Sequence, residues 1–205
     1  MTRPLPPYHL KFPGELFVPA PGLEKWIRAT FIDEKGPLSF EKHKHLRFAR
    51  IGCLWTNVTN VRQMKTVAAT AEIPRPPQGV SAWAKARWAQ QIREWFKIIP
   101  DFLLTFSAPI WIDVDCDWTR CAIAEHELLH CAQAVDGFGV PRFSSKDGKP
   151  VWALKGHDAE EHVDIVARYG VGAAAGGVRE LVEAASRPPL IGQAQISIAC
   201  GYCLR

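Results

Sequence analysis

The sequence lacks any long apolar run. None of its 205 residues falls in a stretch approaching the 18 apolar residues of a membrane-spanning helix. The first seven residues, MTRPLPP, have no apolar signal core. Neither export nor membrane insertion is therefore predicted, and we expect a cytoplasmic protein with no membrane partner.

Cysteine is also sparse. The six cysteines stand at positions 53, 116, 121, 131, 200 and 203, without the density of a disulfide scaffold. In the absence of an export signal, we expect reduced thiols. Cys200 and Cys203 could form half of a zinc site, a redox pair or two structural thiols, and a lone pair with this spacing favours the structural role.

Concentrated positive charge is missing as well. Lys and Arg total 25 and Asp and Glu 21, which gives a net charge of +4. The densest basic run, residues 41–47 (EKHKHLR), is interpreted as a solvated loop. Nucleic-acid binding usually needs a concentrated basic face, so nucleic acid is not favoured as a partner. The sequence does not specify the oligomeric state.

The composition indicates one globular domain over residues 1–205. Apolar residues make up 47% and charged residues 22% of the chain, and there is neither an internal repeat nor a low-complexity linker. Residues 1–37 are expected to form a proline-rich N-terminal arm, and residues 188–205 a C-terminal tail.

Hydrophobic patterns between these ends predict an α+β fold with a small, mainly antiparallel sheet. Expected strands cover residues 47–55, 65–72 and 101–106, with 110–114 as a continuation or separate edge piece. Expected helices cover residues 81–99, 117–137, 157–169 and 178–186. The long helix carries Trp83, Trp88, Ile92, Trp95 and Ile99 at helical spacing, which predicts a face packed on the sheet.

The most informative stretch is AEHELLH, residues 124–130, which contains the pattern H-E-x-x-H. Residues four apart lie on one face of a helix, so His126 and His130 can turn ring nitrogens toward one cation. Glu127 flanks them and could hold the water that the cation activates. Catalytic zinc takes three protein ligands and an open water position, so a third ligand is needed.

Two positions could supply that ligand. The extended motif H-E-x-x-H-x-x-G-x-x-H/D would use Asp136, but position 133 is Gln, so no helix break is predicted and we reject Asp136. The segment from 157 to 164 offers His157, Glu160, Glu161 and His162, of which we rank Glu161 first, then His157, then Glu160. Nearby Asp158 and Asp164 could orient the ligand histidines.

Three segments together resemble the phage metallopeptidases. They are residues 46–57, the helix with HELLH, and residues 157–161 with the Arg168-Tyr169-Gly170 that follows. The resemblance covers most of the chain from about residue 38 onward. It implies a zincin-like domain, in which the sheet packs against the long helix and the HELLH helix, and it implies a bound Zn²⁺. The resemblance supports this fold and this metal more securely than it supports any substrate.

The resulting hypothesis is a gluzincin-like zinc metallopeptidase. Zinc held by His126, His130 and Glu161 would activate a water, and Glu127 would act as the general base on a peptide or protein substrate. Residues 101–114 are the expected strand for substrate alignment by β-addition. The alternative is a non-catalytic, zinc-stabilised binding protein that contacts a host protein or nucleic acid.

Overall fold

The computed structural model describes residues 3–62, 65–159, 177–192, 194 and 199–200. Its centre is a mixed sheet of β1 (Phe17–Pro19), β2 (Ile51–Thr56), β5 (Phe102–Ser107), β4 (Lys65–Glu72) and β3 (Val61–Arg62), in that order, with β8 (Ala199–Cys200) also paired to β4. The β1–β2, β4–β5 and β3–β4 pairs are antiparallel, whereas β2–β5 and β4–β8 are parallel. The α+β class predicted from the sequence is confirmed.

Alternation along the central strands gives the sheet two different faces, because successive side chains of a strand point to opposite sides. On one face lie the largest core side chains, among them Trp55 of β2 and Phe102, Leu104 and Phe106 of β5. Every residue of β2 is buried, as expected of a strand covered on both faces.

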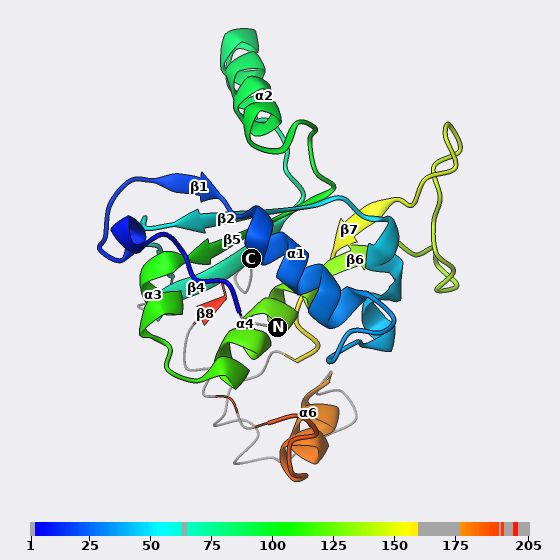
Figure 1. The fold of residues 1–205 in the computed structure, drawn as a ribbon. Helices are drawn as coiled ribbons and strands as arrows, with labels where there is room; N and C mark the ends of the chain where they lie inside the picture. The colour runs from blue at the N-terminus through cyan, green and yellow to red at the C-terminus, as the bar shows by residue number, and fades with distance from the viewer. Residues whose placement is uncertain (1–2, 63–64, 160–176, 193, 195–198, 201–205) are drawn as a thin grey trace.

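Short helices cover this core face. They are α1 (Pro21–Ile27), the π-helical turn η2 (Arg28–Ile32), α3 (Ala108–Asp113) and α4 (Asp117–His130) (Figure 1). Trp111 of α3 is 1% exposed and meets Trp26, Trp55 and Phe106 edge to face, with ring centroids 5.2–6.1 Å apart. Such aromatic contacts add to the stabilisation from buried area.

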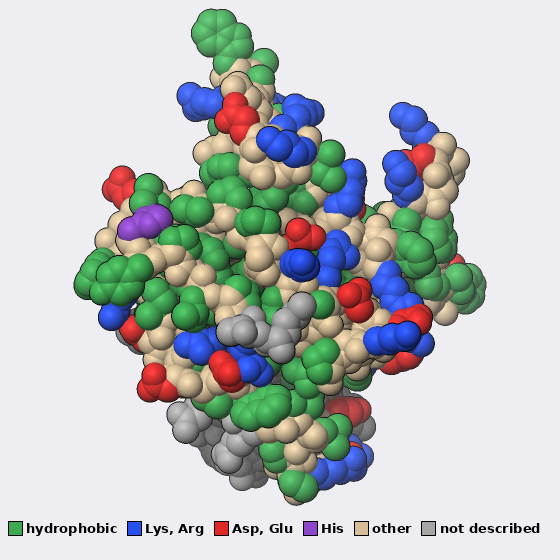
Figure 2. All heavy atoms as spheres, in the orientation of Figure 1, with side chains coloured by type: hydrophobic (Ala, Val, Ile, Leu, Met, Phe, Trp, Pro, Cys, Tyr) green, Lys and Arg blue, Asp and Glu red, His purple; other side chains and the backbone are tan. Residues whose placement is uncertain are grey.

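The opposite face is only partly covered. Helix α2 (Ala82–Phe96) packs through Ile92 against Leu54 and Leu103, and the rest of the helix projects from the body (Figure 1). Figure 2 shows basic side chains along this projecting helix. Beyond α2, the same face is lined by hydroxyl and carboxyl side chains.

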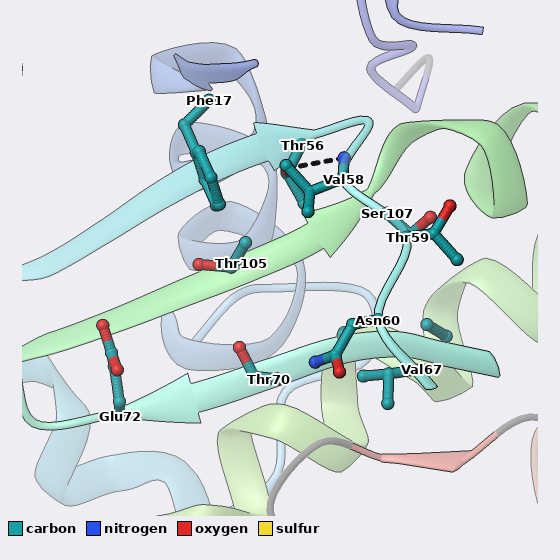
Figure 3. Close-up of a pocket in the computed structure, with 12 residues that line it drawn as sticks. Phe17, Thr56, Val58, Thr59, Asn60, Val67, Thr70, Glu72, Thr105 and Ser107 are labelled. Atoms are coloured by element: carbon teal, nitrogen blue, oxygen red, sulfur yellow. Dashed lines mark hydrogen bonds between the residues drawn. The ribbon is translucent and has the colours of Figure 1, made fainter. Parts of the chain in front are cut away.

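These polar side chains form an open pocket of about 370 Å³. Thr70 and Glu72 of β4 and Thr105 and Ser107 of β5 line it (Figure 3). Partial burial raises the pKa of the Glu72 carboxyl. Since α4 packs on the other face of β4, the pocket lies across the sheet from the residues of the H-E-x-x-H motif.

Most of the expected strands and helices are present. Strands 47–55, 65–72 and 101–106 correspond to β2, β4 and β5. The helix expected at 178–186 is α6 (Val178–Ala185), and that at 81–99 is α2. Helix α2 begins where predicted, because the Ser81 hydroxyl accepts a hydrogen bond from Ala84 N. The tryptophan stripe is only partly a packed face, since Trp83 is 88% exposed.

Three expectations about local structure are wrong. Residues 110–114 do not form a strand but lie largely in α3, which has Pro109 in its first turn. The 41–47 run is not a solvated loop but part of the 3-10 helix η3 (Glu41–Phe48), with His43 buried. Strand β5 cannot align a substrate by β-addition, because β2 and β4 occupy both of its edges.

The N-terminal segment also differs from the expected arm. Residues 20–32 belong to the core, with Leu23, Ile27 and Phe31 at most 1% exposed. Even the first described residues are anchored, because Pro4 O accepts a hydrogen bond from Trp111 Nε1 at 3.1 Å and Arg3 pairs with Asp117. Within the described residues, no helix combines the length and the apolarity that crossing a bilayer requires.

Trp111, which is buried, and Trp83, which is exposed, allow a test of this packing. We expect Trp111→Ala to lower the free energy of unfolding by about 3–5 kcal/mol, because it removes a buried aromatic and leaves a cavity. Trp83→Ala, at the exposed end of α2, should change it by no more than about 0.5 kcal/mol. Urea denaturation measures both values, and equal losses would contradict the described core.

A charged pair holds the starts of the two parallel strands. Arg50, before β2, donates to the carboxylate of Asp101, before β5, through its backbone N (2.8 Å), Nε (3.0 Å) and Nη2 (2.7 Å). Burial opposes ionisation of Asp101, but the hydrogen bonds from Arg50 outweigh it and lower the pKa of the carboxyl. The pair therefore stabilises the register of β2 and β5 while Asp101 is ionised.

Asp101→Asn should lower the free energy of unfolding by about 1 kcal/mol at pH 7. The expected loss is this small because the partner, Arg50, is exposed to solvent. Because the folded-state pKa lies below the unfolded value of about 3.9, this stability is present above pH 4 and is lost as the pH falls through the folded pKa. Denaturation of wild type and variant should therefore converge once the pH falls below the folded-state pKa of Asp101. Asp115→Asn, at an exposed position, should behave as wild type at pH 7 and at this lower pH.

Candidate metal centre

The H-E-x-x-H motif occupies the last turns of α4. His126 is half-buried and His130 is 2% exposed, and both lie on one face of the helix. The helix ends at His130 because Cys131 turns to an extended conformation, with φ −80° and ψ 102°. The expected end near residue 137 is therefore wrong, since Cys131–Gln133 form strand β6.

A β-hairpin follows and returns the chain to the motif. Strand β6 pairs antiparallel with β7 (Trp152–Leu154), in the register Cys131↔Leu154 and Gln133↔Trp152. The hairpin between them projects from the body (Figure 1). Because β6 starts directly after His130 and β7 ends three residues before His157, the two histidines are brought to the same end of the hairpin.

Three histidine nitrogens converge at this point. His126 Nε2 lies 3.2 Å from His130 Nε2 and 3.1 Å from His157 Nε2. The three rings have centroids 4.9–5.1 Å apart, and the ligand atoms all lie within 4.8 Å of one another. Among the described residues, these three histidines are the one group of ligand atoms that could hold a metal ion, and two of them belong to the motif.

The orientation of His130 is fixed by the backbone. Its Nδ1 lies 2.7 Å from Lys155 O, and since a carbonyl can only accept, Nδ1 carries the proton. The neutral ring then presents an unprotonated Nε2 to the other histidines. Lys155 N donates in return to His130 O at 2.9 Å, so one residue holds both the backbone and the ring of His130.

Burial favours the neutral form of His126 and His130. It is the main cause that lowers the pKa of His126 to about 4, and the neighbouring His130 and His157 add to the effect. Burial also lowers the pKa of His130, and the hydrogen bond to Lys155 O opposes the shift. Neutral imidazole is the form that binds a metal ion.

The geometry fits a small divalent cation. Nitrogens bound tetrahedrally at about 2.0–2.1 Å from zinc lie roughly 3.3 Å apart, close to the two Nε2 separations found here. Three imidazoles with an open fourth position form a ligand set of catalytic zinc. The backbone carbonyl on Nδ1 of His130 is the kind of outer partner that such ligands use.

Glu127 lies between the two motif histidines and is 1% exposed. Burial raises the pKa of the Cys131 thiol, and the charge of Glu127 adds to this shift. The carboxylate therefore lies near the end of α4. Of the third-ligand candidates, only His157 is described, and it joins His126 and His130. Glu161, ranked first from the sequence, and Glu160 lie outside the described residues.

Other features of the predicted site differ in the structure. Residues 157–159 are not helical, and the rest of the helix expected at 157–169 lies outside the described residues. Asp158 pairs with Lys155 at 2.5 Å, so a carbonyl rather than this carboxylate orients His130. Asp136 lies on the hairpin, where its carboxylate accepts from Phe138 N and Val140 N, and it is not among the three residues whose ligand atoms converge. The ground for rejecting it from the sequence, a helix unbroken past residue 133, is wrong, because α4 ends at His130.

A glycine lies close to the residue after His157. A Cβ at Gly177, the residue before α6, would lie 2.2 Å from Asp158 O, so no larger residue fits this approach without a shift. Gly177 N also donates to Asp158 O at 3.1 Å. Sequence reasoning missed this contact and the hairpin, although Asp147-Gly148 is a turn signal and Gly148 has φ +66°.

A family model described as "Putative phage metallopeptidase" matches residues 24–186, which is most of the chain. The chain belongs to this family. The matched range contains α4, the β6–β7 hairpin and His157, and it confirms the resemblance seen in the sequence. Neither the curated proteins nor the solved structures include a detectable match to the chain.

Substitution of His157 tests the three-histidine centre. We expect His157→Ala to weaken zinc binding by more than the roughly 10–100-fold typical for loss of an outer-sphere partner, because one of three converging nitrogens is removed. Zinc affinity, measured by competition with a chromogenic chelator, checks this. The control is His9→Ala, at an exposed position far from His157 in the sequence, and it should bind zinc as wild type does.

Proposed function

We propose that the protein is a zinc-dependent peptidase that uses Glu127 as its general base. The observation that carries the proposal is the convergence of His126, His130 and His157 Nε2 at the end of the helix that bears the motif. Family membership supports a metallopeptidase activity and peptide or protein substrates.

In this proposal His126, His130 and His157 hold the metal. His157 replaces Glu161 as the first candidate because its Nε2 lies 3.1 Å from that of His126. A three-histidine set differs from the gluzincin-like set expected from the sequence. Glu161→Gln therefore serves as the comparison for His157→Ala, and the variant with the larger loss of zinc affinity identifies the third ligand.

Bound zinc would lower the pKa of a coordinated water and polarise the peptide carbonyl. The chain's own residues supply the proton transfers. Glu127, one residue after His126, would accept a proton from the attacking water and later donate it to the leaving amine. The low exposure of Glu127 limits competing solvent, which strengthens its electrostatic interactions.

The test compares two glutamates on one helix. Glu127→Gln should lower kcat/KM on a peptide library by about 100- to 10,000-fold, the range for loss of a general acid–base group, while one zinc per chain stays bound. Glu125→Gln, two residues earlier and 21% exposed at its side chain, should retain activity within about threefold.

The outcomes separate the two functions considered for the chain. If zinc binds but wild type and Glu127→Gln cleave equally, Glu127 is not the base and the peptidase proposal fails. If zinc binds and no peptide is cleaved by either protein, the centre belongs to a zinc-stabilised binding protein. Absence of zinc from a wild-type protein offered one equivalent would reject both.

A further inference from the structure

The 3-10 helix η3 carries two histidines against the metal-binding helix. It contacts α4 and β6, and three residues per turn bring His43 and Leu46 to one buried face. His45 lies on another face of the same short helix and is half-buried. Neither histidine belongs to the converging group of three.

His45 makes the direct contact with the motif. Its Nε2 lies 2.8 Å from Cys131 O, and since the carbonyl accepts, Nε2 donates. Cys131 directly follows His130 and is 1% exposed. The last carbonyls of a helix have no intrahelical partner, and a buried carbonyl without a partner is costly. His45 therefore satisfies the backbone where α4 becomes β6.

The same ring also reaches the second strand of the hairpin. The centroid of His45 lies 6.4 Å from that of Trp152 in β7. Through Cys131 and Trp152, His45 touches both strands at the base of the hairpin. This base joins His130 at one end to His157 at the other, so a shift there changes the separation of the two nitrogens.

His43 differs in character. Its Nε2 lies 3.5 Å from a carboxylate oxygen of Glu125, beyond hydrogen-bond range, and neither ring nitrogen makes a hydrogen bond within the described residues. Its ring instead meets Phe40 edge to face at 5.5 Å. His43 thus packs beside α4, whereas His45 binds it.

We propose that His45 is a positioning residue for the metal centre, which acts through the Cys131 carbonyl to fix the spacing of His130 and His157. It does not touch the metal or the substrate. This inference rests on the zinc site of the proposed function but not on peptidase activity. Loss of its hydrogen bond should weaken metal binding more than it weakens the fold.

The experiment measures zinc affinity by chelator competition in wild type and three variants. His45→Leu removes the donor and should weaken zinc binding by about 10- to 100-fold, as loss of an outer partner typically does. His45→Gln keeps a donor at similar reach and should stay within about threefold of wild type. The visible absorption of the cobalt-loaded protein should change in His45→Leu and not in His45→Gln.

Thr56→Val is the matched control. It removes a hydrogen bond from a side chain to a backbone carbonyl, Thr56 Oγ1 to Leu16 O at 2.9 Å, at the other end of the adjoining sheet. The same oxygen also accepts from Val58 N at 3.1 Å, and this bond is lost too. Its melting temperature should fall, while its zinc affinity and cobalt spectrum should match wild type. A merely structural role of His45 would move these readouts equally in both proteins.

Two results overturn the proposal. One is wild-type zinc affinity in His45→Leu. The other is an equal loss of affinity in Thr56→Val at equal loss of melting temperature. If His45→Leu does not fold, His45→Asn, whose shorter amide does not reach Cys131 O, takes its place under the same criteria. If wild type itself binds no zinc, the metal centre fails together with this inference, whereas a loss confined to His45→Leu supports it even without peptidase activity.

Discussion

The reciprocal hydrogen bonding between His130 and Lys155 is the interaction on which the candidate centre depends. One bond joins the backbones and the other joins the ring of His130 to the Lys155 carbonyl. Together they fix a ligand's tautomer and bring a residue 25 positions later into register with it. His157 lies two residues beyond Lys155, so these bonds also hold it close to His130.

The sheet supplies the rigid support for this arrangement. α4 packs through Ala124 and Leu128 into the main core, on the face that holds Trp55 and Phe106. The two candidate ligands on α4, His126 and His130, therefore rest on the buried core. The third comes from a loop after β7, and it is held by a backbone register and by the close approach of Gly177 to Asp158 O.

Much of this could be predicted from the sequence, for identifiable reasons. Period-two and period-3.6 patterns, with the Ser81 cap, identified β2, β4, β5 and α2 because these elements follow local rules. His126 and His130 were identified as candidate ligands from a motif whose spacing is itself helical. For 110–114, Ile110, Ile112 and Val114 suggested a strand, yet Pro109 in the first turn begins a helix there.

The rest depends on contacts between distant residues. Nothing local in Cys131-Ala132-Gln133 ends a helix, since the segment has no glycine or proline. It becomes a strand because β7 pairs with it. The place of His157 beside the motif likewise follows from that register, and the hydrogen bond of His45 joins it to a carbonyl 86 residues away. Such effects follow from tertiary structure, and local propensity does not encode them.

The hairpin between the ligands has one more consequence. The distance between His130 and His157 is set where β6 and β7 pair, a ladder that Ala134 N extends by donating to Val151 O at 2.7 Å. Residues 136–149 lie beyond this pairing. Side chains such as Phe138, 94% exposed, stand on this outer stretch. The chain can therefore lengthen, shorten or exchange its sequence there without rebuilding the centre, and evolution or engineering can alter what this surface contacts while the chemistry stays the same.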